Sequence, residues 1–66
     1  MHITLNGKPH PLDRGTTLAQ LVEQLELANK RIAVEVNDDL VPRSEHPQHH
    51  LSDGDRVEIV HAIGGG

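Results

Sequence analysis

The sequence predicts an α+β domain in which a mixed sheet of four to five strands carries one main helix across one face. Three observations lead to this fold class. The chain has 66 residues, which is enough for one small domain. Short strand-like segments lie near both ends and in the middle of the chain. A single segment has helical spacing, and one helix covers only one face of a sheet.

The N-terminal segment predicts a β-hairpin. Ile3 and Leu5 alternate with polar residues, as in a half-buried strand. Asn6-Gly7 follows and favours a tight turn, because both residues tolerate positive φ. The return strand is expected from Lys8 to Leu12. Its two prolines cannot donate to a ladder, so this strand belongs at an edge of the sheet.

The next segment predicts the helix. Thr17 is the expected N-cap, with Gln20 completing a capping box, and Thr16 is the alternative cap. We expect the helix to end at about residues 27–28, with Asn29 in the left-handed position after it. The apolar residues of this segment recur at helical spacing: Leu18, Leu21, Val22 and Leu25.

The second half of the chain predicts further strands. Ile32 to Val36 is the clearest of them, and residues 37–39 form the following turn. Residues 40–41 begin a short return strand, which a proline stops. Residues 44–51 are polar and histidine-rich, and are expected to form a loop or a single helical turn. Val57 to Ile63 is the final strand, expected parallel to the first in the centre of the sheet. The predicted core contains Ile3, Leu5, Leu18, Leu21, Val22, Leu25, Ile32, Val34, Val36, Val57 and Ile59.

Composition excludes several classes of function. The absence of cysteine excludes disulfides, thiol nucleophiles and zinc-thiolate sites. A net charge of −4 without aromatic residues argues against nucleic-acid binding. No apolar run approaches a membrane span, and the N-terminus does not resemble a signal peptide, so we expect a cytoplasmic protein that does not act at membranes. A domain of this size leaves little room for a deep pocket, which argues against an enzyme.

The C-terminal residues Gly64, Gly65 and Gly66 are the most informative feature. We expect a domain over residues 1–63 and a flexible glycine tail over 64–66. A tail without side chains can thread a narrow channel and present an unhindered carboxylate. Formation of a mixed anhydride with AMP would make that carboxylate an electrophile. The alternative interpretation is an ordinary frayed terminus.

The other polar clusters are interpreted as surface loops and turns. His46, His49 and His50 lie close enough in sequence to bind a transition metal. A polar loop with weak metal affinity is the preferred interpretation, and no metal site is predicted. The acidic pairs 38–39 and 53–55 lack the spacing of a Ca²⁺ loop and are interpreted as turns.

The last strand offers a docking surface. Val57 and Ile59 fall on one face, whereas Val60 and Ala62 fall on the other. If the helix covers the first pair, Val60 lies exposed beside the tail, where it fits a partner-binding surface. A single harmless exposed valine is the alternative.

Together these features resemble the β-grasp fold of ubiquitin-like proteins, and more closely the sulfur carrier proteins of thiamine biosynthesis, the ThiS family. The resemblance covers essentially the whole chain. It rests on five segments: Ile3-Thr4-Leu5-Asn6-Gly7, Ala33-Val34-Glu35-Val36-Asn37, Val41-Pro42-Arg43-Ser44-Glu45, Asp53-Gly54-Asp55 and Ala62-Ile63-Gly64-Gly65-Gly66. Family members often have an aromatic residue where this chain has His46, which bears on the packing of that loop.

The resemblance implies a function. The Gly66 carboxylate would be adenylated with ATP by an adenylyltransferase similar to ubiquitin-activating enzymes. Sulfur from cysteine, delivered through a desulfurase, would convert it to a thiocarboxylate, which thiazole synthase would use. Partner contacts are expected at Val60, Ala62, Ile63, Gly64 and Gly65, and the chain itself would bind no cofactor.

Alternative functions remain open at this point. The small subunit of molybdopterin synthase shares the fold and the tail chemistry, and other carriers serve cysteine or methionine synthesis or modify proteins. The acceptor enzyme that uses the thiocarboxylate distinguishes among these carriers. A metal-binding module based on the histidine loop is the alternative from a different class. It predicts stoichiometric metal binding that is lost without His49 and His50.

Overall fold

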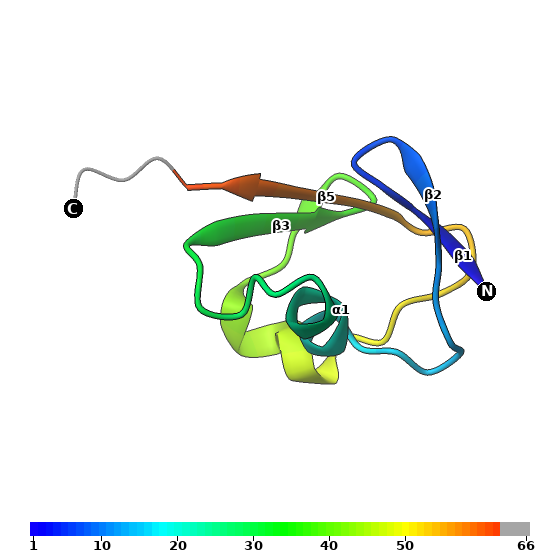
Figure 1. Ribbon diagram of the computed structural model, residues 1–66, viewed down its shortest axis with the longest axis horizontal. Helices are drawn as coiled ribbons and strands as arrows, with labels where there is room; N and C mark the ends of the chain where they lie inside the picture. The colour runs from blue at the N-terminus through cyan, green and yellow to red at the C-terminus, as the bar shows by residue number, and fades with distance from the viewer. Residues whose placement is uncertain (63–66) are drawn as a thin grey trace.

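A computed structural model describes residues 1–62 of the chain, which form a five-stranded mixed sheet with helices on one face (Figure 1). Residues 63–66 lie outside the described part. The strand order is β2-β1-β5-β3-β4, which confirms the predicted fold class. The elements are β1 (His2–Leu5), β2 (Lys8–Pro11), α1 (Leu18–Gln24), β3 (Ile32–Val36), β4 (Asp39–Leu40), the 3₁₀ helix η1 (Arg43–Gln48) and β5 (Arg56–His61).

β5 is the central strand, as predicted. It pairs in parallel with β1, where Thr4 lies opposite Arg56, and antiparallel with β3 on its other side. β2 and β4 form the two edges. The sheet therefore encloses the strand that leads to the C-terminus between two neighbours.

The prolines of β2 show why this strand occupies an edge. Leu12 N donates to Met1 O over 2.8 Å, which marks one hydrogen-bonded pair of the β1–β2 ladder. Because such pairs alternate along an antiparallel ladder, Pro9 and Pro11 fall at positions whose missing N–H would point away from β1. Neither proline therefore costs a ladder hydrogen bond.

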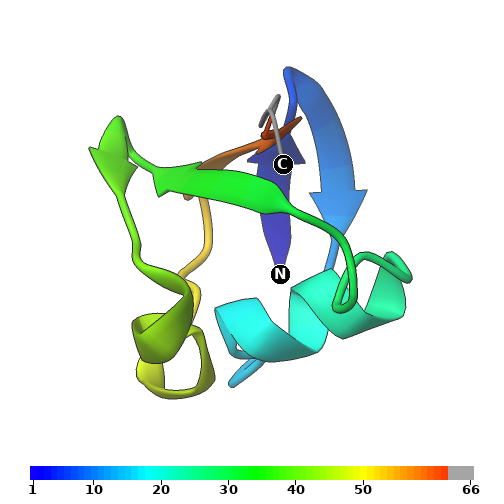
Figure 2. The same ribbon diagram turned by 90° about the vertical axis from the view of Figure 1, so that its left-hand side faces the viewer.

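α1 begins as the sequence predicts. Gln20 N donates to Thr17 Oγ1 over 3.2 Å, and Thr17 N donates to Gln20 Oε1 over 2.8 Å, which completes the capping box. Figure 2 shows that α1 and η1 lie on the same side of the sheet. No helix within residues 1–62 has the length and apolar content needed to cross a membrane.

The prediction of the helix end at residues 27–28 is wrong, because α1 stops at Gln24. Glu26 adopts a left-handed φ of 61°, and its N–H donates to Glu23 O over 2.9 Å. Leu27 N then donates to Val22 O over 3.0 Å. These two bonds form a Schellman motif, so Glu26 takes the place that the sequence suggested for Asn29.

The short return segment also differs from the expectation. β4 covers Asp39–Leu40 and is centred one residue earlier than predicted. Val41 lies beyond the strand, but its N–H still donates to Val34 O over 2.9 Å. η1 then runs for six residues, which makes it longer than a single turn. β5 begins at Arg56, one residue earlier than predicted, and ends at His61.

The core lies between the sheet and the two helices. Eight of the predicted core residues are buried, whereas Leu5, Leu25 and Ile32 only pack against its margin. Connecting segments supply three further core residues that the periodicity did not indicate: Leu12, Val41 and Leu51. The full set of buried apolar residues is Ile3, Leu12, Leu18, Leu21, Val22, Val34, Val36, Val41, Leu51, Val57 and Ile59.

Candidate functional site: the central strand and the surface beside the C-terminus

The central strand β5 leads directly to the C-terminal residues. Ala62, the last described residue, is exposed, and its N–H donates to Arg31 O over 2.9 Å. Ile63, Gly64, Gly65 and Gly66, which the sequence singled out, lie outside the described residues. The structure therefore fixes the point from which these residues depart and the surface that surrounds it.

Two asparagine side chains hold β5 along its length. Asn6, in the β1–β2 turn, binds both backbone groups of Ile59 through its side-chain amide. Asn37, in the β3–β4 turn, accepts from Arg56 N through Oδ1 over 2.9 Å. Both asparagines have positive φ, 49° and 52°. Their turn conformation was predictable from sequence, but their contacts to a distant strand were not.

The open face of the sheet bears the exposed side chain expected next to the tail. Val57 and Ile59 are buried against the helices, whereas Val60 is 58% exposed on the opposite face, as predicted. Leu40, 65% exposed, lies opposite Glu35 in the β3–β4 pair. The two large exposed hydrophobic residues of the described chain are thus in neighbouring parts of one face.

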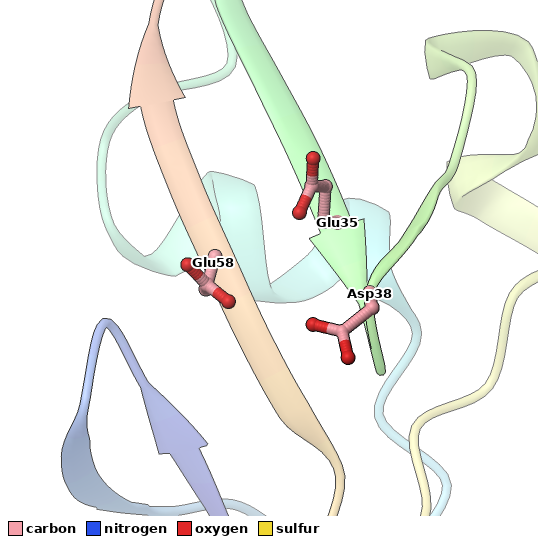
Figure 3. A group of neighbouring side chains, drawn as sticks. All are labelled: Glu35, Asp38 and Glu58. Carbon is pink, nitrogen blue, oxygen red and sulfur yellow. The ribbon is translucent and has the colours of Figure 1, made fainter.

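Three carboxylates share this open face. Glu35, Asp38 and Glu58 are exposed, and their oxygen atoms lie within 4.8 Å of one another (Figure 3). Glu35 and Glu58 are direct cross-strand partners, an arrangement that like charges make unfavourable. Asp38 Oδ2 also lies 3.0 Å from Arg56 Nη2, and this contact raises the pKa of the Arg56 guanidinium. The face therefore presents an acidic group as well as exposed apolar residues.

The histidine cluster predicted from sequence is not a cluster of free ligands. His46 is only 5% exposed, and its Nε2 lies 3.0 Å from Val41 O. Because a carbonyl only accepts, this nitrogen carries the proton and is not available to a metal in that state. His49 is half-buried and His50 is exposed. Within residues 1–62, the three imidazoles do not come together as a group of metal ligands.

His46 occupies the position at which family members often have an aromatic residue, and it is buried. His46 is the buried residue of η1, and η1 packs against α1 on the same side of the sheet (Figure 2). An imidazole that donates to Val41 O can thus fill an interior position within this loop.

The acidic residues 53–55 form a turn, as predicted. Asp53 Oδ1 accepts from His2 N over 2.8 Å, and Asp55 Oδ2 accepts from Ser52 N over 2.8 Å. The hydrogen bond from the His2 N–H is the main cause that lowers the pKa of Asp53. Asp55 also accepts from Asn37 Nδ2 over 3.0 Å. These carboxylates tie the start of β5 to its neighbours.

The fold and the exposed end of β5 define the class of the molecule, a ubiquitin-like β-grasp protein. The sequence profile of the ThiS family matches residues 3–66, and the chain belongs to this family. Its fold is similar to the crystal structure of the thiamine biosynthesis protein ThiS from Geobacter metallireducens. The TM-score is 0.86, with 32% identity and complete coverage of both chains.

The relatives include both a small sulfur carrier protein and a much longer thiazole synthase. The chain is 39% identical over 64 residues to the sulfur carrier protein ThiS of Thermus thermophilus, covering 97% of this chain and 98% of the relative. It is 44% identical over 66 residues to a thiazole synthase of Magnetococcus marinus, covering 100% of this chain. The chain spans only 20% of the length of that second relative.

Proposed function

We propose that this protein carries sulfur as a thiocarboxylate on Gly66 and delivers it to thiazole synthase in thiamine biosynthesis. One observation carries the proposal: the family match extends to residue 66, four residues beyond Ala62, the exposed residue that follows the central strand. The name of the Thermus thermophilus relative, a sulfur carrier protein, supports it.

The proposed chemistry requires only the C-terminal carboxylate from this chain. A carboxylate oxygen attacks the α-phosphorus of ATP, pyrophosphate leaves, and an acyl-adenylate forms on Gly66. A persulfide sulfur derived from cysteine by a desulfurase then displaces AMP and forms an acyl disulfide on Gly66. A second thiol attacks the carrier sulfur of this S–S bond, so that a disulfide forms and the thiocarboxylate is released. The reacting atoms must be held in near-attack geometry, which the activating enzyme provides. The chain is thus a covalent substrate in this proposal, and ATP is bound by the partner.

Two enzymes follow as partners. The first is an adenylyltransferase similar to ubiquitin-activating enzymes, which forms the acyl-adenylate in the cytoplasm. The second is thiazole synthase, which accepts the sulfur. The Magnetococcus marinus relative supports this second partner, because a protein named thiazole synthase contains a segment that matches the whole of this chain.

We assign the open face of the sheet to the adenylyltransferase. Val60 is exposed on this face, two residues before Ala62, and the acidic group of Glu35, Asp38 and Glu58 lies on the same face. An apolar contact with polar groups at its margin is the usual composition of a protein interface. A partner with basic side chains around an apolar centre would complement it.

An ATP–pyrophosphate exchange assay with the adenylyltransferase of the same organism tests the proposal. The wild-type chain should support exchange, and a chain without Gly66 should not, although its thermal unfolding is unchanged. Normal exchange by the shortened chain would overturn the carrier function.

The acceptor is tested separately. Intact protein isolated from its own cells should contain a fraction heavier by the difference between one sulfur and one oxygen atom. This form should lose its sulfur to thiazole synthase. Turnover by the large subunit of molybdopterin synthase instead would reassign the carrier to that pathway.

A further inference from the structure

The backbone of β5 points its hydrogen-bonding groups to alternate sides. Asn37 N donates to Arg56 O over 2.8 Å, and Ala62 N donates to Arg31 O over 2.9 Å, which marks hydrogen-bonded pairs with the β3 side. These pairs alternate with non-bonded pairs along an antiparallel ladder. The backbone groups of residues 57, 59 and 61 therefore face the β1 side of the sheet.

The groups facing β1 have partners only as far as Ile59. Asn6 N donates to Val57 O over 2.9 Å, and the Asn6 side chain binds Ile59 N and Ile59 O. β1 ends at Leu5, so β5 continues past the β1–β2 turn with only β3 alongside (Figure 1). Within residues 1–62, no hydrogen bond is formed by the outward backbone groups of His61.

A hollow lined in part by aliphatic side chains lies beside this free edge. Its volume is about 290 Å³. The early end of α1 helps to form it, because the chain turns at Glu26 and leaves two half-buried leucines at its wall. The hollow is lined by Leu5, Asn6, Leu25, Leu27, Ile59 and His61.

We propose that this edge and hollow bind an extended segment of the adenylyltransferase, which pairs with His61 as an added strand and inserts an apolar side chain into the hollow. Strand addition obtains affinity from main-chain hydrogen bonds and specificity from pockets for alternate side chains. The His61 N–H and C=O would form the main-chain hydrogen bonds, and the leucine-lined hollow would serve as the side-chain pocket. This inference rests on the proposed function, which requires an enzyme to approach Gly66.

The position of His61 explains why the activating enzyme is the occupant. Gly66 is the fifth residue after His61. A chain of five residues spans at most about 17 Å. An enzyme strand anchored at His61 therefore has the carboxylate within reach of an active site in the same protein. The open-face contact at Val60 lies on another surface and leaves this edge accessible.

Amide hydrogen exchange tests the edge directly. In the free protein, the His61 amide should exchange much faster than the Ile59 and Ala62 amides, which are hydrogen-bonded. Addition of the adenylyltransferase should slow exchange at His61. Slow exchange at His61 in the free protein, or no change in the complex, would overturn the proposal.

A proline substitution tests the same edge in the exchange assay. We expect His61→Pro to fold, because the His61 N–H points away from β3 and forms no hydrogen bond in the sheet. Pro9 and Pro11 occupy equivalent positions in β2, where the backbone nitrogen points away from β1. It should raise the KM for the carrier about tenfold, which matches the loss of one main-chain hydrogen bond and its strand pairing. His61→Ala keeps the N–H and removes only the side chain that lines the hollow, so as the matched control it should raise this KM less than His61→Pro does.

The outcomes separate this inference from the proposed function. An unchanged KM for His61→Pro, or equal losses for His61→Pro and His61→Ala, would overturn strand addition. The requirement for Gly66 would still hold in that case. Exchange that continues without Gly66 would instead overturn the carrier function itself.

Discussion

The side-chain amide of Asn6 binds both backbone groups of Ile59, 53 residues further along the chain. Its Oδ1 accepts from Ile59 N over 2.8 Å, and its Nδ2 donates to Ile59 O over 3.3 Å. The side-chain amide thus continues the hydrogen bonding between β1 and β5 beyond Leu5, where β1 ends. This contact fixes β5 three residues before Ala62 and beside the edge that remains open.

Replacement of Asn6 measures this contact. Asn6→Gly keeps the positive φ of 49° and removes the amide, so it should cost about 1–2 kcal/mol from two part-buried hydrogen bonds. Asn6→Ala should cost about 1 kcal/mol more, because alanine is strained in this conformation. Urea unfolding measures both values. A glycine variant as stable as the wild type would show that the amide contributes nothing.

The histidine loop should need no metal. EDTA should leave the melting temperature unchanged, because a structural metal site would carry folding free energy. His46→Ala should nevertheless cost about 1–3 kcal/mol, since it removes a buried ring and leaves Val41 O without its donor. Thermal unfolding with and without EDTA separates the two effects. A large decrease on chelation would restore the metal-binding hypothesis.

Local patterns in the sequence were sufficient for most of the fold. The alternation in β3 and the capping box at Thr17 can be recognised from residues close together in the sequence, and both were confirmed. The helix end was not, because Glu26 adopts a left-handed φ without being glycine or asparagine. Leu51 and His46 are buried in segments without periodicity, where burial depends on what the fold places above them.

The surface beside the C-terminus was only partly predictable. The exposure of Val60 follows from strand alternation and was correct. The bond between Asn6 and Ile59 joins opposite ends of the chain, and no local pattern records it. The free edge at His61 depends on where β1 ends relative to β5, which is a property of sheet register.

The ionisation of Asp53 should make the stability of the folded protein depend on pH in the acid range. The hydrogen bond from His2 N–H lowers the Asp53 pKa in the folded protein, so the folded state binds protons less readily than the unfolded state. The resulting stabilisation is fully present above the unfolded pKa and is lost as pH falls through the lower folded pKa. Melting temperatures of wild type and Asp53→Asn should therefore differ at pH 7 and converge at acid pH. A constant difference would contradict this assignment.

Val60 should matter for docking more than for folding. Val60→Asp places a charge at a contact that must be desolvated, so the KM for the carrier in ATP–pyrophosphate exchange should rise about tenfold or more. Unfolding should change little, because Val60 is 58% exposed. Ser44→Asp adds the same charge at an exposed position of η1 and serves as the control. Equal exchange by the Val60 and Ser44 variants would remove Val60 from the interface.

The two glycines before Gly66 should differ in their tolerance to substitution. The carrier reaction requires Gly66 to reach the α-phosphorus of ATP inside another protein, and misplacement of reacting atoms lowers rates by orders of magnitude. A β-branched side chain at Gly65 restricts the backbone next to the reacting carboxylate and widens the chain there. Gly65→Val should therefore unfold like the wild type but support little exchange. Gly64→Ala lies one residue further from the carboxylate and adds only a methyl group, so it should remain active and serve as the matched control. Full activity of Gly65→Val would show that the activating enzyme does not require a narrow thread at this position.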